Sequence, residues 1–335
     1  MVNGPGHRPG PLRSPARLAR GIVPMATTSA RAPGSLLLRG DAKRRRKEHG
    51  VRLIFQSAAL LSLAISVAIV LALIGEALSW VFRVDLSTLW SDGWFPRRGE
   101  FDILTLLLGT LLVAVIAMVV ATPLGLGAAM YLSEYAKPRT RRILKPILEV
   151  LAGVPSVVLG YFALTVVQPD LVKQIFPGAT AYSFLAAGIG VGILTIPLVA
   201  SVAEDAMFAV PRVLREAAYG IGARRATVTA RVVFPAAVSG IVASLILGLS
   251  RAIGETMVVA IAAGASGSAL RTVDPIDGGQ TMTGAIASLA IGSDQVRGSS
   301  LAFPSLFFVG MCLFVLTFTL NVLSERFVRR VRKDY

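Results

Sequence analysis

The stretch EAAYGIGARRATVTARVVFP, residues 216–235, places a charged segment with a turn signal between two apolar runs that are each long enough to cross a membrane. It starts with Glu-Ala-Ala, and Gly222 follows after three residues. After nine more residues come an apolar triplet and Pro235. Because glycine permits a tight turn, the pattern predicts a short helix, a turn and a second helix. Such a unit can seat in a groove on a soluble partner, and we interpret it as a docking surface, not as a catalytic site.

An amphipathic helix lying on the membrane surface is the alternative interpretation of this segment. Arg224, Arg225 and Arg231 would suit that role as well. Composition alone, however, does not place Glu, Ala, Ala, Gly and Pro at fixed intervals. The spacing therefore favours docking.

The composition of the whole chain indicates a membrane protein. Of the 335 residues, 54% are hydrophobic and only 16% are charged, and the mean hydropathy is +0.68. A soluble domain of this size would be less apolar. The net charge of +15 does not indicate nucleic-acid binding, because aromatic content is low and the basic residues lie in the N-terminal region and between apolar runs.

Six apolar segments meet the length of roughly 20 residues that a helix needs to cross a bilayer core of about 30 Å. We therefore predict an all-α, polytopic protein with six transmembrane helices. The predicted spans are 54–75, 103–121, 147–167, 183–203, 238–263 and 303–323. Residues 1–50, rich in Pro, Gly, Ser and Arg, are predicted to be a disordered basic cytoplasmic tail, and 51–335 to be the transmembrane domain.

The distribution of basic residues predicts the orientation of the six spans. If both termini are cytoplasmic, 27 of the 34 Lys and Arg residues fall on the cytoplasmic side, six fall outside, and Arg251 lies within a span. This asymmetry is the one that the positive-inside rule requires. The same orientation places the loop 204–235 in the cytoplasm, where a soluble partner can reach it.

Several kinds of chemistry are excluded by the residues present. Cys312 is the only cysteine, so the chain can form no internal disulfide and no multi-cysteine metal site. His7 and His49 both lie in the polar N-terminal region, which argues against HExxH zinc sites and histidine-based triads. No GxxxxGK[ST] phosphate-binding loop occurs. We expect no metal or cofactor in this chain, so any ATP hydrolysis would fall to a partner.

Proline and glycine occur inside several predicted spans. Small residues let helices pack closely and proline introduces kinks, and we favour this structural reading. The alternative is that these breaks let the helices rock during transport. The residues concerned are Pro123, Pro155, Pro197, Gly248 and Gly254.

Arg251 and Glu255 lie one helical turn apart in the middle of the fifth predicted span. An arginine at that depth costs about 2.5–3.5 kcal/mol on the insertion scale, so it needs a compensating role. One reading is a structural ion pair, although Arg before Glu is the weaker order at this spacing. We favour the other reading, a substrate contact that lines a translocation path.

The two side chains suggest an oxyanion cargo. A guanidinium presents paired donors that match phosphate or sulfate oxygens. An ionised carboxylate can only accept hydrogen bonds, so Glu255 should repel sulfate and accept a hydrogen bond from protonated phosphate. Our hypothesis is that Arg251 attracts the anion, while Glu255 selects an anion that carries a proton by accepting a hydrogen bond from it.

The spacing within residues 216–235 resembles the EAA loop, EAAxxxG(x9)IxLP, by which bacterial ABC importer permeases contact their ATPase subunits. VPRVLREAAYGIGARRATVTARVVFP and GLSRAIGETMVVAIAAG are similar to phosphate-specific permeases, in particular the PstC type, and YLSEYAKPRTRR and LAGVPSVVLGYFAL resemble the same family. GETM after Arg251 is closer to PstC than to PstA, where GETAP is expected. The resemblance runs from about residue 100 to the C-terminus. The basic N-terminus and VVF in place of IxL depart from it.

The resemblance implies the fold of an ABC type I importer permease in a bacterial cytoplasmic membrane. It also implies a second, PstA-type permease, two PstB-type ATPases that bind ATP and Mg²⁺, and an extracytoplasmic PstS-type phosphate-binding protein. Arg251 and Glu255 would line the substrate pathway. Coupling to the ATPases would fall to Glu216, Ala217, Ala218, Gly222 and Pro235.

Other transporters and a membrane enzyme remain as alternatives. A molybdate, sulfate or amino-acid permease would share the loop, but RAIGETM argues against these cargoes. A secondary transporter driven by an ion gradient would need no docking loop. A membrane-embedded enzyme is poorly supported, because the spans contain no His and no paired Asp residues at catalytic spacing, and Cys312 is the only cysteine.

Overall fold

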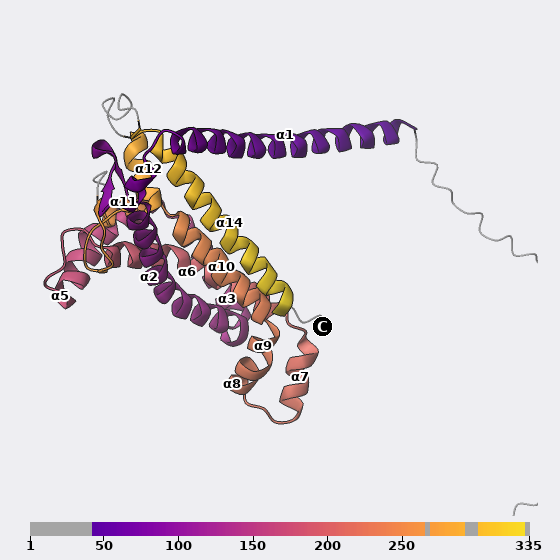
Figure 1. Ribbon diagram of the computed structural model, residues 1–335. Helices are drawn as coiled ribbons and strands as arrows, with labels where there is room; N and C mark the ends of the chain where they lie inside the picture. The colour runs from indigo at the N-terminus through magenta and orange to yellow at the C-terminus, as the bar shows by residue number, and fades with distance from the viewer. Residues whose placement is uncertain (1–41, 265–268, 292–300, 332–335) are drawn as a thin grey trace, which may run out of the picture. The chain divides into compact units, whose positions relative to one another are not determined.

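The computed structural model describes residues 42–264, 269–291 and 301–331 (Figure 1). It falls into two parts, residues 1–63 and 64–335, and the first helix crosses the boundary between them. The helices that pack together belong to the second part, which is called the body below.

Along the described chain the elements are α1 (Ala42–Val81), η1 (Leu86–Trp90), β1 (Gly93–Phe95), η2 (Pro96–Arg98), β2 (Glu100–Phe101), α2 (Ile103–Met130), η3 (Tyr131–Tyr135), α3 (Pro138–Ala152), α4 (Ser156–Phe162), η4 (Ala163–Val172), α5 (Lys173–Ile175), α6 (Phe184–Phe208), α7 (Arg212–Gly220), α8 (Arg225–Val228), η5 (Thr229–Val233), α9 (Phe234–Ala236), α10 (Val238–Gly254), α11 (Met257–Ala262), β3 (Ala269–Leu270), α12 (Met282–Ile291) and α14 (Ser305–Val331).

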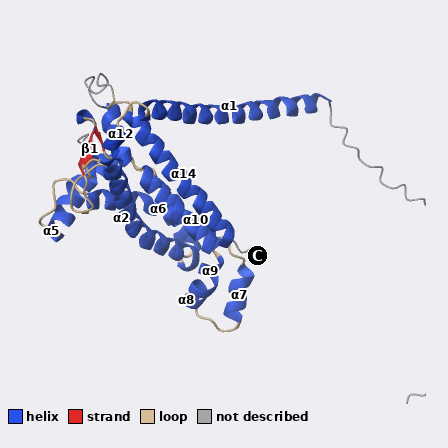
Figure 2. Ribbon diagram, in the orientation of Figure 1, coloured by secondary structure: helices blue, strands red, loops and turns tan. Residues whose placement is uncertain are grey.

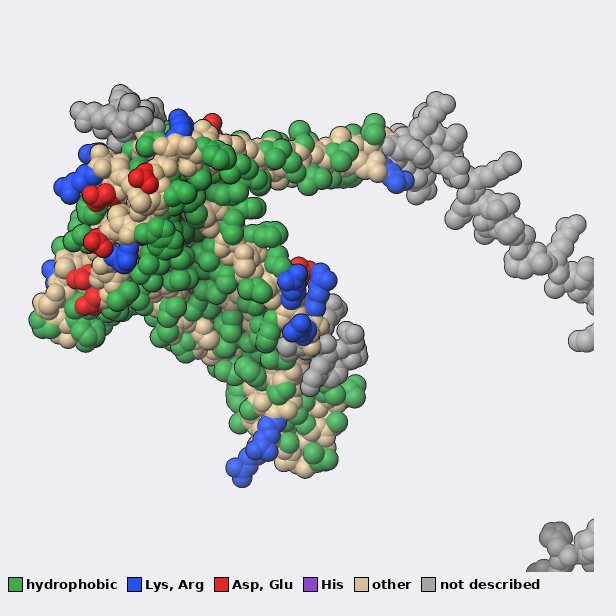
Figure 3. All heavy atoms as spheres, viewed as in Figure 1, with side chains coloured by type: hydrophobic (Ala, Val, Ile, Leu, Met, Phe, Trp, Pro, Cys, Tyr) green, Lys and Arg blue, Asp and Glu red, His purple; other side chains and the backbone are tan. Residues whose placement is uncertain are grey.

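The described helices confirm the all-α membrane architecture. Four are long and apolar enough to cross a bilayer: Gly50–Val81, Ile103–Tyr135, Phe184–Phe208 and Ser305–Arg330. Two further helix pairs, each bent, bring the number to six if each pair counts as one span. On the face seen in Figure 3, hydrophobic side chains cover the middle of residues 64–335, and charged side chains gather toward the ends. This banding is what a bilayer requires.

The third predicted span, 147–167, is not one straight helix. Helix α3 ends at Ala152 and α4 begins at Ser156, and the run 138–152 makes an angle of 85° with the run 156–175. Gly153 and Pro155 lie at the break. Proline cannot donate a backbone hydrogen bond and restricts the residue before it, so the helix stops there. The prediction of one continuous helix was wrong, because apolar residues continue across the position where the helix stops.

The fifth predicted span, 238–263, is also broken. Helix α10 ends at Gly254 and the short α11 begins at Met257, so Glu255 and Thr256 lie between two helices. A second bend, of 73°, precedes α10 and separates it from the run 225–236. Arg251 and Glu255 therefore lie at a helix end, and not in the middle of a continuous span.

Helix α1 begins at Ala42, inside the segment 1–50 that the composition predicts to be a tail. Residues 43–48 are all Lys, Arg or Glu, which have good helix propensity, and no proline or glycine occurs between Ala42 and Gly50. The helix therefore extends from the span into the charged run. The remainder of the predicted tail, residues 1–41, lies outside the described residues.

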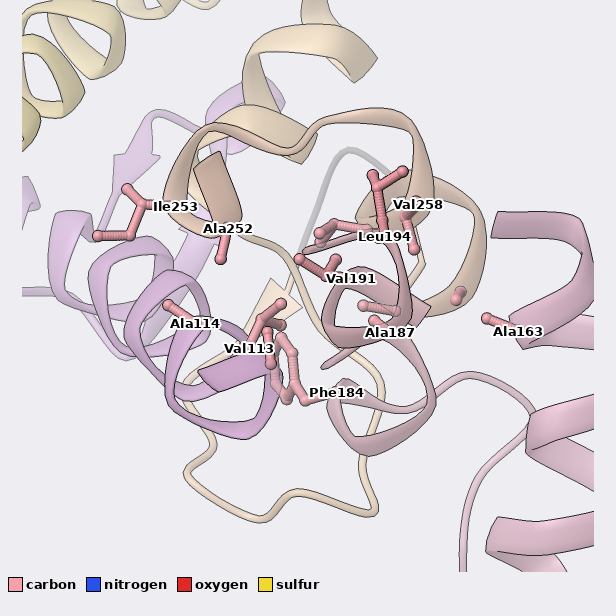
Figure 4. Packing of buried hydrophobic residues seen from close by; sticks show 14 residues of the cluster. Val113, Ala114, Ala163, Phe184, Ala187, Val191, Leu194, Ala252, Ile253 and Val258 are labelled. Atoms are coloured by element: carbon pink, nitrogen blue, oxygen red, sulfur yellow. The ribbon is translucent and has the colours of Figure 1, made fainter. Parts of the chain in front are cut away.

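Small residues bring α2 and α6 close together. The two helices share a buried core with α10 and α11, which includes Val113, Ala117, Ala187 and Val191 (Figure 4). Gly188 of α6 fits directly against Ile116 of α2, where a β-carbon would come within 2.5 Å of the Ile116 side chain. Gly248 of α10 likewise lies against Val199 and Thr195. The packing interpretation therefore holds for Gly248, whereas a β-carbon at Gly254 would meet only open space.

Gly188→Ala should destabilise the protein, because neither helix can yield without displacing the other. We expect a loss of about 1–3 kcal/mol of stability, measured as a lower midpoint of thermal unfolding in detergent. Gly127→Ala in α2 is the matched control, since a β-carbon there has no neighbour within 4 Å. Equal midpoints for the two variants would contradict the close α2–α6 contact.

A small antiparallel sheet, which the sequence did not predict, lies at the end of the body opposite α7 and α8 (Figure 2). Its strand order is β2-β1-β3, with Trp94 opposite Phe101 and Ala269. Asp102 caps α2 and accepts a hydrogen bond of 3.0 Å from Nε of Arg271. This hydrogen bond raises the pKa of Arg271. The sheet thereby joins the segment before α2 to the segment after α11.

Candidate functional site

The helix, turn and helix predicted from residue 216 onward are present as α7, a turn at Gly222, and α8. Gly222 has a φ of +81°, in the left-handed region where residues with a β-carbon are strained. The N–H of Ala223 donates to the carbonyl of Ala218 at 3.1 Å, and the N–H of Gly222 donates to the carbonyl of Tyr219 at 2.9 Å. These bonds close the C-terminus of α7 in the manner of a glycine C-cap. Gly222 therefore sets the shape of the α7–α8 segment, residues 212–228.

One face of α7 is covered by no other described residue. Val213, Glu216 and Ala217 are exposed at helical spacing, and Ile221 follows at the helix end. Val213 is 72% exposed and Ile221 is 87% exposed. Glu216 forms no hydrogen bond or ion pair with a described residue. Apolar side chains around a free carboxylate make this outward face suitable for contact with another protein.

The opposite face of α7 packs against the body. Leu214 and Ala218 lie one turn apart and both are partly buried. They pack with Ala223 on a core contributed by α2, α6 and the helices after the turn, which contains Ala129, Ala203, Met207, Val210, Val228, Val233, Ala237 and Ile241. Of the predicted docking residues, Glu216 and Ala217 thus face outward, while Ala218 faces the body.

Pro235 lies in α9, away from the turn. It is exposed and belongs to the helical run that ends just before the 73° bend into α10. The π-helical η5 precedes it in the same run. Proline at this point leaves no N–H to continue the hydrogen-bond ladder, which suits a helix that must change direction. Its role in coupling stays a prediction.

Arg251 and Glu255 lie at the break between α10 and α11. Arg251 is exposed, on the same face of α10 as the exposed Leu247 and Gly254, and forms no hydrogen bond or ion pair with a described residue. Glu255 instead caps α11, where its Oε1 accepts from the N–H groups of Met257 at 3.2 Å and Val258 at 3.4 Å. The structural ion pair between Arg251 and Glu255 is therefore not present. Among the described residues, Arg251 thus has no partner, and Glu255 has one carboxylate oxygen, Oε2, without a hydrogen bond.

A buried polar cluster adjoins Glu255. The hydroxyl of Thr283 donates to the backbone carbonyl of Glu255 at 2.8 Å, and Thr281 bonds to Thr283 at 3.1 Å. Both side-chain polar atoms of the neighbouring Gln280, which is 1% exposed, have no described partner. These contacts fix the backbone at the break between α10 and α11.

Ion pairs between α3 and α6, two of them at the buried Glu204, were not predicted from the sequence. Glu204 of α6 has a fully buried side chain, which accepts a 2.7 Å bond from Nζ of Lys145 and also contacts Arg141. Lys145 reaches Asp205 at 2.5 Å as well. These pairs join α3 to α6. Because the partners lie about 60 residues apart in sequence, no local spacing reveals them.

The comparison with known families now identifies the chain. Residues 121–333 match the family described as "Binding-protein-dependent transport system inner membrane component". The chain belongs to this family. It is therefore a permease of an ABC importer, in agreement with its four to six membrane-length helices.

Relatives of this family match most of the chain. It is 31% identical to the probable ABC transporter permease protein YqgH of Bacillus subtilis, over 84% of this chain and 91% of the relative. It is 32% identical to the phosphate transport system permease protein PstC of Mesorhizobium japonicum, over 82% and 88%. It is 30% identical to PstC of Haemophilus influenzae, over 83% and 93%.

A solved structure supports the fold of the family. The crystal structure of a bacterial ABC transporter involved in the import of the acidic polysaccharide alginate superposes with a TM-score of 0.56. The match covers 86% of this chain and all of that chain, at 14% identity. It confirms the arrangement of helices that was expected for an importer permease.

Proposed function

We propose that this chain is a permease subunit of an ATP-driven importer of inorganic phosphate in a bacterial cytoplasmic membrane, with both termini in the cytoplasm. It pairs with a second permease of the PstA type and receives phosphate from an extracytoplasmic binding protein of the PstS type. Two separate ATPase subunits of the PstB type bind ATP and Mg²⁺ and carry out the hydrolysis. This chain itself holds no cofactor and is not an enzyme.

The observation that carries this proposal is the outward face of α7. Its free carboxylate, Glu216, stands between small and apolar side chains on a helix whose end is fixed by Gly222. A secondary transporter has no use for such a surface. The positive-inside asymmetry supports a cytoplasmic location for it, within reach of an ATPase.

The free Arg251 supports an anionic cargo, and the relatives named as phosphate permeases support phosphate. Arg251 lies on a face of α10 that the described residues leave exposed. In a pair of permeases this face would border the path between the two subunits. There the guanidinium can meet a phosphate with two parallel hydrogen bonds.

Reconstitution tests the proposed function. The chain, co-expressed with its three partner types and placed in lipid vesicles, should take up phosphate only when both ATP and the loaded binding protein are present. Uptake that follows an ion gradient without ATP would identify a secondary transporter instead. Preference for molybdate or sulfate over phosphate would overturn the assigned cargo but keep the transporter class.

Glu255→Gln isolates the charge of this carboxylate, because glutamine can still accept the hydrogen bonds that cap α11. If Glu255 accepts a hydrogen bond from the protonated oxygen of phosphate, the variant should lose selectivity for phosphate over sulfate by about 10-fold or more, as expected for one charge-assisted hydrogen bond. Competition between the two anions for uptake in vesicles measures this ratio. Unchanged phosphate flux together with an unchanged ratio would refute the hypothesis.

A further inference from the structure

Arg215 immediately precedes Glu216 in the sequence, yet the two side chains have opposite surroundings. Glu216 is exposed and has no described partner, whereas the Arg215 side chain is only 16% exposed. Consecutive residues of a helix point about 100° apart, so one can face an outside partner while the next faces the body. Arg215 therefore lies on a side of α7 that faces the body, next to the outward face.

Arg215 joins three elements through directed hydrogen bonds. Its Nη2 lies 2.9 Å from Oε1 of Glu134, and its Nε lies 3.3 Å from the same oxygen. It also donates to the carbonyls of Met207 at 2.8 Å and Val210 at 2.5 Å, at the end of α6. The Glu134 side chain is only 4% exposed. Arg215 thus forms four hydrogen bonds at the junction of α7, η3 and the end of α6.

The position of Glu134 extends this connection into the membrane. Glu134 lies in η3, a π-helical turn that continues α2 without a break, and π-helical turns occur often at functional sites. Helix α2 packs along both α6 and α10, and α10 carries Arg251. A displacement of Glu134 would therefore move the helix that lies beside the proposed substrate path.

The other contacts between α7 and the body differ in kind. Leu214 and Ala218 make apolar contacts, which have no preferred direction and let one surface slide over another. An arginine held by several acceptors fixes both distance and orientation. Among the described residues, Arg215 thus holds α7 to the body by hydrogen bonds of fixed geometry.

We propose that the Arg215–Glu134 pair is the strut that transmits movement of α7 to α2. When the ATPases displace the outward face, Arg215 pulls η3 and the end of α6 with it. Without the strut, α7 would still dock but would move over its apolar contacts without moving the spans. This inference rests on the proposed coupling of α7 to an ATPase.

A pair of substitutions separates transmission from stability. Arg215→Met and Glu134→Leu, combined in one chain, replace the buried pair by apolar side chains, which commonly preserves stability. In the reconstituted complex we expect the double variant to assemble with the ATPases and to keep its thermal midpoint. ATPase stimulation by phosphate-loaded binding protein should fall to the basal rate, and phosphate uptake should fall at least 10-fold. Arg215→Lys, which keeps the charge and part of the bonding, should retain a measurable fraction of both.

Arg212→Met is the matched control, since Arg212 lies on the same helix, is exposed, and has no described partner. It should leave stimulation and uptake unchanged. Normal stimulation in the double variant, or loss of stimulation only in step with its thermal midpoint, would overturn the strut. A wild-type complex that binds no ATPase or shows no stimulation would instead overturn the proposed function, and the strut with it.

Discussion

Gly222→Val is expected to reduce the amount of ATPase that co-purifies with this permease by at least 10-fold. The left-handed φ of +81° at Gly222 closes the end of α7, and a β-branched residue there costs about 1–3 kcal/mol in backbone strain. The segment would relieve this strain by changing the turn, and the outward face of α7 would lose its shape. Affinity purification followed by quantitation of both subunits measures the result.

Gly222→Asn is the control for this prediction, because asparagine tolerates the left-handed conformation better than valine does. A β-carbon at position 222 meets nothing within 4 Å, so backbone strain is the only expected difference. The asparagine variant should keep most of the ATPase. Glu216→Lys, which reverses the free charge without strain, should lose it. An intact complex in both the valine and the lysine variants would exclude docking through this segment.

Arg251→Met is expected to lower phosphate uptake by about 100-fold, as would follow from losing a charge-assisted, two-bond contact worth about 3 kcal/mol. Arg251 has no described partner within the chain, so its removal should not lower the thermal midpoint. ATPase co-purification should also be unchanged, because the α7–α8 segment is untouched. Uptake, unfolding and co-purification measured on one preparation test the three expectations together.

Leu247→Ala is the matched control for Arg251, since both side chains are exposed on the same face of α10. It should change uptake by less than the arginine variant does. If Arg251→Met instead lowered the thermal midpoint and uptake in parallel, Arg251 would have a structural role. That outcome would exclude the direct substrate contact.

Four of the six predicted spans match long helices of the structure, and two do not. Apolar runs located the helices Gly50–Val81, Ile103–Tyr135, Phe184–Phe208 and Ser305–Arg330, because each run stays helical from end to end. The third and fifth spans were misplaced, because hydropathy does not register a break at Gly153–Pro155 or a helix that ends at Gly254. Glu255 illustrates the second error. It was considered as one half of an i to i+4 pair, and it caps a new helix instead.

The sequence by itself determined the class of this protein, the helix, turn and helix of the proposed docking segment, and the presence of a costly charge at Arg251. These features depend on composition and on short, regular spacings, which operate within a few residues along the chain. Only the tertiary structure decided which side of α7 is free, that Arg251 and Glu255 do not pair, and that Arg215 binds Glu134. Those contacts join residues up to 81 positions apart, so they exist only once the helices have packed. The proposed docking surface thus depends on the local sequence, whereas its proposed attachment to the spans depends on how the helices pack.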